Sequence, residues 1–385
     1  MSTAAQSPPP SPRPSPVARA QGFWQRVSEG RDIDDLWSQF AADARSSYGF
    51  YGKDVDWEEI HKLPAWRRPF HVAGQLFWAM MNKLTPARRV LLLIALVLLV
   101  LSGVHVQSGN FNAEIDFKLI AALLFLLLLS LELADKVIMK RDLEIAREIQ
   151  TWLVPSEPPA IPNAEVAFST RPQNSVAGDY YDAFYPLKTA EANGKLMLVM
   201  ADVAGKSVPA ALLMATLQAS LRTIASEGIS LTQLAERLNH YACDHSLGGQ
   251  RFTTAVIGEF DPATRQFSYV NAGHNSPVVH RHGNDAVERL ESSGLPLGIE
   301  SSATYPASQV ALQSGDTLVL FTDGVVEAFN AAGEEFSDAR FVNAIRSLPE
   351  LSAQATLRAL MKYVEDFVGA TRQSDDITCL VLQIK

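Results

Sequence analysis

The chain has 385 residues, 47% of them hydrophobic, which is enough to bury one full domain and leave accessory segments. A formal net charge of −9 argues against a protein that binds nucleic acid. The two cysteines, Cys243 and Cys379, exclude a disulfide framework and indicate a reducing compartment for the second half of the chain. The amino terminus lacks the apolar core of a secretory signal, so none is predicted.

The first two segments differ in composition. Residues 1–20 are rich in proline and serine and contain almost no large apolar groups, which predicts a disordered tail. Residues 21–88 predict a cytoplasmic helical segment of unknown role. Part of it repeats apolar residues at helical spacing beside basic ones: Phe70, Ala73, Phe77, Met80 and Leu84, with Arg67, Arg68 and Lys83. A helix on a membrane surface and ordinary packing of a small helical module explain this pattern equally well.

Two apolar runs predict a two-helix membrane hairpin over residues 89–134. Val90–Val106 and Leu119–Leu131 are leucine-rich on all sides, as lipid-facing helices are, although a buried helical hairpin is the alternative. Basic residues precede the first run and follow the second, so the positive-inside rule predicts that both termini are cytoplasmic. The expected location is the inner or cell membrane, crossed by two spans.

Residues 135–160 predict a linker helix that also dimerises. Leu131, Ile138, Ile145 and Trp152 recur every seven residues, but the positions three residues after each of the first three are only partly apolar. A weak coiled coil and a homodimer are therefore expected, and a group of prolines between residues 155 and 162 ends the helix.

Acidic residues mark four strand ends in residues 161–385. Asp179 and Asp202 flank a predicted hairpin whose polar turn ends in Asn-Gly, so folding brings them to the same end. Asp323 follows a buried-strand run, and Asp375-Asp376 opens the final strand. A single Asp-Gly is more often a plain turn, but four acidic strand ends favour a metal site. Oxygen ligands without a histidine or cysteine cluster suit Mg²⁺ or Mn²⁺ rather than Zn²⁺.

The order of elements in this half predicts an α+β fold. Strands and helices come in clusters rather than in strict alternation, which favours a layered domain over a doubly wound parallel sheet. Helices are expected over residues 209–226, 231–245, 340–347 and 353–369.

Rival catalytic motifs are weak. Gly205-Lys206-Ser207 resembles the end of a P-loop, but the required earlier glycine is Met200, which disfavours nucleotide hydrolysis. No G-x-S-x-G motif follows a strand, and neither cysteine has the neighbours of a cysteine phosphatase. His274, at a predicted strand end, is more often a structural residue than a catalyst.

Seven segments of the chain resemble the SpoIIE-like (RsbU-type) branch of the metal-dependent PPM serine/threonine protein phosphatases. They match in order and spacing over about residues 142–385: AREIQTWLVP (146–155), GDYYD (178–182), DVAGKSVPAALLMA (202–215), NAGHNSP (271–277), GLPLGI (294–299), FTDGVVEA (321–328) and SDDIT (374–378). The resemblance implies a layered α-β-β-α domain, two packed antiparallel sheets flanked by helices, with two Mn²⁺ or Mg²⁺ ions at one edge.

The resemblance also implies a ligand set. Asp179 would bind one metal, Asp202 would bridge both, and the backbone carbonyl of Val203 would complete a site. Asp323 and Asp375 would hold the other ion, with the adjacent Asp376 as the alternative ligand. These aspartates would act through a water molecule that the ions activate. The phosphate-binding arginine of the wider superfamily is replaced here by Asn174, with Arg171 nearby.

The predicted function is a membrane-anchored phosphoserine/phosphothreonine phosphatase. The resemblance implies a phosphorylated STAS-type anti-anti-sigma protein as substrate. A catalytically silent membrane scaffold with a residual metal site is one alternative, and a hydrolase of small phosphate esters is another.

Overall fold

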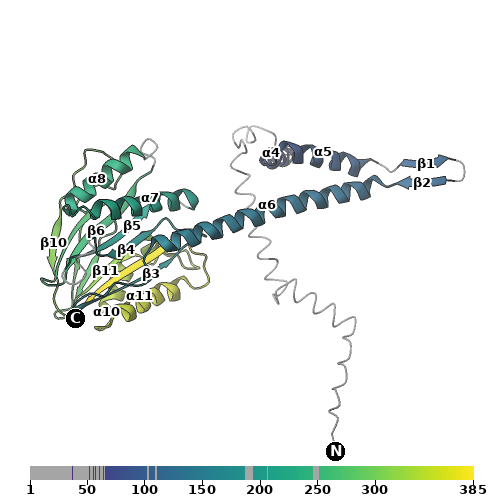
Figure 1. The fold of residues 1–385 in the computed structure, drawn as a ribbon. Coiled ribbons are helices and arrows are strands. Elements are labelled where there is room, and N and C mark those ends of the chain that lie inside the picture. The colour runs from purple at the N-terminus through teal and green to yellow at the C-terminus, as the bar shows by residue number, and fades with distance from the viewer. Residues whose placement is uncertain are drawn as a thin grey trace, which may run out of the picture. The chain divides into compact units, whose positions relative to one another are not determined.

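The computed structural model describes residues 37, 52, 55, 57, 60, 64, 66–101, 104–108, 111–186, 194–205, 207–245 and 251–385 (Figure 1). The tail predicted over residues 1–20 lies outside the described residues. So do most of residues 21–65, which belong to the segment predicted over residues 21–88. The chain separates into two compact units, Met1–Asp135 and Lys136–Lys385, and each is described by itself.

In the described part of the first unit, two helices and a hairpin precede a long helix, and the residues of this helix after Asp135 belong to the second unit. These elements are α4 (Arg68–Lys83), α5 (Pro86–Val100), β1 (Val104–Ser108), β2 (Phe111–Ile115) and α6 (Phe117–Leu153). Helix α4 is the helix expected from the apolar spacing, and Phe70 and Trp78 on it are 75% and 60% exposed. Arg88 of α5 donates hydrogen bonds to Glu132 and Asp135 of α6, at 2.9 and 2.6 Å.

Helix α5 is shorter than predicted. The first apolar run was expected to continue to Val106, but the helix ends at Val100 and the next described element is a strand paired with β2. The sequence after the helix contains Gly103 and β-branched residues, which favour a strand over a helix. At 15 residues, α5 is shorter than the roughly 20 that a membrane span needs.

Among the described residues, two helices are long and apolar enough to cross a membrane, α6 and α7 (Val208–Ala225). Helix α6 has 37 residues and includes both the second apolar run and most of the predicted linker. Helix α7 belongs to the second unit, where it buries Ala210, Met214 and Leu221. These buried residues serve the packing of that unit, whereas Leu212 on the same helix is 63% exposed.

Two five-stranded antiparallel sheets form the centre of the second unit, as predicted. The first has the order β10-β7-β6-β5-β4 and the second the order β3-β12-β11-β8-β9. The strands are β3 (Ala164–Arg171), β4 (Tyr180–Phe184), β5 (Leu196–Val203), β6 (Thr253–Asp261), β7 (Gln266–Ala272), β8 (Val278–Arg281), β9 (Ala286–Arg289), β10 (Ser308–Ala311), β11 (Thr317–Phe321) and β12 (Ile377–Ile384).

Alternating side chains divide the core of this unit into layers. Leu198 and Met200 of β5 pack between the sheets with Leu320 of β11, whereas Val199 points to the opposite face and packs under α7. Helix α8 (Leu231–Asp244) shares that outer layer.

Helices also cover the second sheet. They are α10 (Asp338–Ser347) and α11 (Ala353–Val368), on the side away from α7 and α8 (Figure 1). These four helices lie close to the ranges that the sequence predicts. The order of layers is α-β-β-α, which confirms the layered α+β fold.

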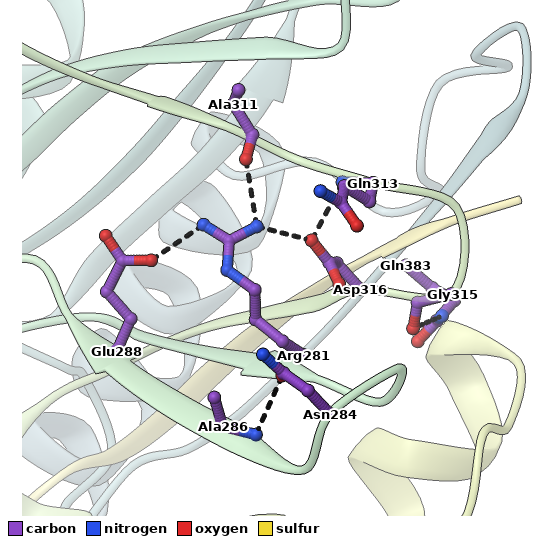
Figure 2. Close-up of polar contacts among 9 residues, drawn as sticks. All are labelled: Arg281, Asn284, Ala286, Glu288, Ala311, Gln313, Gly315, Asp316 and Gln383. Atoms are coloured by element: carbon purple, nitrogen blue, oxygen red, sulfur yellow. Dashed lines mark hydrogen bonds and ion pairs between the residues drawn. The ribbon is translucent and has the colours of Figure 1, made fainter.

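Arg281 joins the two sheets at one end (Figure 2). Its guanidinium donates to the carbonyl oxygen of Ala311 in the first sheet, at 2.9 Å, and to the buried carboxylate of Asp316, at 2.7 Å. It also pairs with Glu288 of β9. Arg281 ends β8, next to the start of β11, whereas Asp323 follows the other end of β11. The Arg281 contacts therefore lie at the opposite end of β11 from this predicted metal ligand.

Candidate metal centre

Asp179 and Asp202 meet across the first sheet. Asp179 directly precedes β4, and Asp202 lies near the end of β5. Tyr180 pairs with Ala201 in the antiparallel ladder, so the two aspartates occupy the next opposing positions. The hairpin prediction that brought them together is confirmed by this register.

Gly178 allows the two strand ends to approach. A Cβ atom at this position would lie 3.3 Å from the carbonyl oxygen of Val203 and 3.2 Å from the Cβ of Ala210. The backbone oxygen predicted as a metal ligand therefore lies beside the residue that precedes Asp179.

Asp179 also connects the two sheets. One of its carboxylate oxygens accepts hydrogen bonds from the hydroxyls of Thr322, at 2.8 Å, and Thr378, at 2.5 Å. Thr322 follows β11 and Thr378 lies in β12, both in the second sheet. Sequence reasoning missed these two threonines, although each stands next to a predicted acidic motif, within FTDG or SDDIT.

Asp375 and Asp376 have different surroundings. The buried carboxylate of Asp376 accepts backbone N–H groups from Gln173, at 2.6 Å, and Gly178, at 2.7 Å, so both of its oxygens are used by the fold. Asp375 is half-buried and accepts the backbone N–H of Asp376 at 2.9 Å. This difference favours Asp375 over Asp376 as the metal ligand.

Asp323 begins the short helix α9 (Asp323–Val326) immediately after β11. A Cβ atom on the next residue, Gly324, would lie 1.9 Å from the carbonyl oxygen of Asp376, so only glycine fits there. That close approach places the Asp323 and Asp375 segments side by side at the end of the second sheet.

The carboxylates of Asp179, Asp202 and Asp376 lie close enough that simultaneous negative charge on all of them is unfavourable. Burial raises the pKa of Asp179 well above its usual range, and the nearby carboxylates of Asp202 and Asp376 raise it further. The Thr378 and Thr322 hydroxyls act on this pKa in the opposite direction. Burial also raises the pKa of Asp376, against the lowering effect of its backbone hydrogen bonds.

The donor chemistry fits a hard divalent cation, because every candidate ligand offers oxygen and a cation would offset the repulsion among the carboxylates. Asp202, Asp323 and Asp375 are all half-buried and so retain access to solvent. Within the described parts of the chain, however, no three His, Cys, Asp or Glu side chains are gathered closely enough to form a ready-made metal cluster.

His274 is hydrogen-bonded to β6, the strand that pairs with the Asp202 strand β5. Its Nδ1 forms a 2.8 Å hydrogen bond with the hydroxyl of Thr254, the residue that pairs with Asp202 in the ladder. Burial lowers the pKa of His274 to about 4. A neutral, buried histidine with this partner fits a structural role.

Comparison with known proteins identifies the family and the fold of this part of the chain. The family model of Stage II sporulation protein E (SpoIIE) matches residues 192–385. "Phosphoserine phosphatase RsbU" of Bacillus subtilis is 29% identical over 188 residues, covering 49% of this chain and 54% of the relative. "Phosphoserine phosphatase RsbP" of the same organism is 25% identical over 193 residues, covering 49% and 46%. The chain spans about half the length of these curated relatives.

Solved structures show the same fold. The SiaA-PP2C domain of Pseudomonas aeruginosa superposes with a TM-score of 0.55 at 20% identity, covering 66% of this chain and 99% of that domain. A Bacillus subtilis structure containing the PP2C phosphatase domain of SpoIIE has a TM-score of 0.51 at 19% identity, covering 58% and 64%. At these identities the likeness establishes the fold.

Proposed function

The chain belongs to the SpoIIE family, in its RsbU-type PPM phosphatase branch. We propose that it is a metal-dependent phosphoserine/phosphothreonine protein phosphatase and that its first unit anchors it in a membrane. The observation that carries the proposal is the position of Asp179. It lies opposite Asp202 in one sheet and accepts hydrogen bonds from Thr322 and Thr378 of the other.

Two Mn²⁺ or Mg²⁺ ions fit the donor set. Asp179 and the carbonyl of Val203 would hold one ion, Asp202 would contact both, and Asp323 and Asp375 would hold the other. When bound, the ions would supply an activated water for in-line attack on phosphorus and neutralise the phosphoryl oxygens. The threonine hydroxyls keep Asp179 in one orientation, and Asp376 fixes the backbone of Gly178.

A phosphorylated STAS-type protein is the proposed substrate, because two relatives are named phosphoserine phosphatases and the family resemblance implies such a partner. We propose a homodimer through residues 135–160. Ile138, Ile145 and Trp152 of α6, which recur every seven residues, are 59%, 47% and 74% exposed, and a second copy of the helix would cover them.

Membrane anchoring rests on the first unit. Leu119, Leu123, Leu126 and Leu129 of α6 are all more than half exposed, as expected of a helix that contacts lipid. In the predicted hairpin over residues 89–134, α6 is long enough for a span, whereas α5 has only 15 residues. We propose that the hairpin still forms two spans, the first of which also uses residues that flank α5, and that both termini lie in the cytoplasm.

A catalytically silent membrane scaffold is the second candidate. It is favoured by the lack of three ligand side chains already gathered among the described residues. The two candidates differ in whether added metal produces turnover.

The test is phosphate release from a phosphoserine STAS-type protein by the full chain in mild detergent, with Mn²⁺, with Mg²⁺ or with EDTA. We expect turnover only when a metal is added, and its loss in Asp202→Asn. Asp366→Asn is the matched control, because Asp366 is an exposed aspartate on α11 that pairs with Lys362. A folded protein that binds the substrate but shows no turnover with either metal would support the scaffold instead.

A further inference from the structure

A cavity of about 250 Å³ adjoins the acidic strand ends of the second sheet. Gly324, which follows Asp323, and Ser374, which precedes Asp375, both line it. The lining therefore includes the sequence neighbours of two proposed metal ligands, although neither Asp323 nor Asp375 itself lines the cavity. A ligand in the cavity would contact an apolar wall, to which four side chains contribute: Val364, Val368, Ile377 and Phe329.

Two arginines also line the cavity, Arg171 at the end of β3 and Arg372 in the loop before β12. Arg372 is exposed and forms no ion pair with any of the residues that the structure describes. Arg171 pairs with Glu365 at 3.2 Å, and both side chains are more than half exposed. Solvent screens such a surface pair, so another anion can displace the glutamate at little cost. The cavity thus offers two guanidinium groups, and its lining also includes one carboxylate, that of Glu365.

The loop that carries Arg372 is fixed beside Arg171. The side-chain amide of Gln373 donates to the carbonyl oxygen of Arg171, at 2.6 Å, and to that of Asp375, at 2.5 Å. These bonds hold the end of β3, the Arg372 loop and a proposed metal ligand in one arrangement. The backbone of Arg171 and that of Asp375 are consequently joined through the residue that follows Arg372.

We propose that this cavity is an anion-binding subsite for the phosphorylated segment of the protein substrate, with Arg372 as the main positioning residue and Arg171 as its partner. The inference rests on the proposed phosphatase function. Guanidinium groups bind phosphate and carboxylate in the same forked geometry, so the anion is the phosphoserine phosphate or an acidic side chain beside it. The apolar wall receives a neighbouring hydrophobic side chain.

Direct binding tests the subsite without catalysis. The full chain in detergent with EDTA is titrated with three fluorescent peptides: phosphoserine flanked by aspartates, phosphoserine flanked by asparagines, and serine flanked by aspartates. We expect Arg372→Ala to raise the Kd of the first peptide about tenfold, and Arg171→Ala to raise it less. Arg372→Lys should restore part of the affinity, because lysine keeps the charge but not the fork.

The pattern across peptides identifies the anion. A loss that extends to the asparagine-flanked phosphopeptide assigns the phosphate, and a loss confined to the two aspartate-flanked peptides assigns the flanking carboxylate. Arg358→Ala is the control, because Arg358 is exposed on α11 and does not line the cavity. Circular dichroism confirms that each variant is folded.

Two results would overturn the subsite: a wild-type protein that binds none of the peptides, or a Kd that Arg372→Ala leaves unchanged. Turnover with Mn²⁺ separates this outcome from failure of the proposed function. Arg372-dependent binding by a protein inactive with every metal would refute the phosphatase and leave the subsite. Normal turnover with no effect of Arg372→Ala on Kd or KM would refute only the subsite.

Discussion

Gln150 of α6 forms both hydrogen bonds of its side-chain amide with a single residue, Ala177. Its Nε2 donates to the Ala177 carbonyl oxygen at 2.7 Å, and the Ala177 N–H donates to its Oε1 at 2.9 Å. The next residue, Gly178, donates to Asp376, and Asp179 follows. The last turns of α6 are therefore hydrogen-bonded to the segment that carries the first proposed metal ligand.

We predict that Gln150→Ala weakens metal binding. Without the amide, the buried backbone groups of Ala177 lose their partners, at a cost of about 1–3 kcal/mol for each group, and the segment before Asp179 can shift. The Mn²⁺ concentration for half-maximal phosphate release should rise several-fold. Glu148→Gln, an exposed change on the same helix, should leave it unaltered. Equal metal dependence in wild type and Gln150→Ala would exclude this coupling.

The adjacent acids Asp375 and Asp376 should respond differently to removal of their charge. Asp375→Asn should lower Mn²⁺ affinity with little change in stability, because Asp375 is half-buried. Asp376→Asn should destabilise the fold by about 1–3 kcal/mol, because its buried carboxylate accepts two backbone N–H groups. Isothermal titration with Mn²⁺ and thermal unfolding measure the two effects. The assignment of Asp375 as ligand fails if only Asp376→Asn reduces Mn²⁺ affinity.

Arg222 of α7 and the fully buried Asp182 of β4 form a forked ion pair next to the site. The guanidinium donates to both carboxylate oxygens, at 2.8 and 2.9 Å, and the Tyr180 hydroxyl donates to the same carboxylate at 2.6 Å. Arg222→Ala leaves a buried carboxylate without its cation, but Arg222 is 42% exposed and solvent screens the pair, so the loss should be about 1–3 kcal/mol. Circular dichroism should show a markedly lower midpoint of thermal unfolding.

Arg237→Ala is the control for this pair. Arg237 also pairs with a carboxylate, Glu227, but both side chains are about half exposed. Such a surface pair contributes about 0–1 kcal/mol, so its loss should hardly move the midpoint. Similar shifts in the two variants would show that burial of Asp182 adds nothing to the pair.

The proposed membrane topology can be tested by labelling introduced cysteines. With Cys243 and Cys379 replaced by alanine, Asn112→Cys in the hairpin between the spans should react with an impermeant maleimide added outside intact cells. Lys140→Cys should react only after the cells are opened, because two spans would place it in the cytoplasm. Labelling of both positions from outside would contradict the two-span arrangement.

The sequence predicted the pairing of Asp179 with Asp202 because its signals are local. Apolar strand runs and a polar turn that ends in Asn-Gly are enough to predict that the two residues lie at the same end of a hairpin. The contacts of Asp179 with Thr322 and Thr378 could not be predicted this way, because they depend on how the two sheets pack. The two threonines follow Asp179 in the sequence by 143 and 199 positions. The end of α5 was misjudged for a different reason, because hydrophobicity alone does not distinguish an apolar helix from an apolar strand.

His274 should make stability depend on pH between its ordinary pKa of 6.5 and its folded value of about 4. Because burial favours the neutral ring, the unfolded chain binds the proton first as pH falls. The free energy of unfolding therefore keeps its full value with respect to His274 above pH 6.5. As the pH falls toward 4, this free energy decreases by up to about 3 kcal/mol. Urea unfolding of wild type and His274→Gln across this range measures it. Other titrating groups contribute equally to both proteins, so the difference between their free energies of unfolding isolates His274. We expect this free energy to decline less steeply with falling pH in the variant. Parallel declines would show that His274 titrates normally in the folded state.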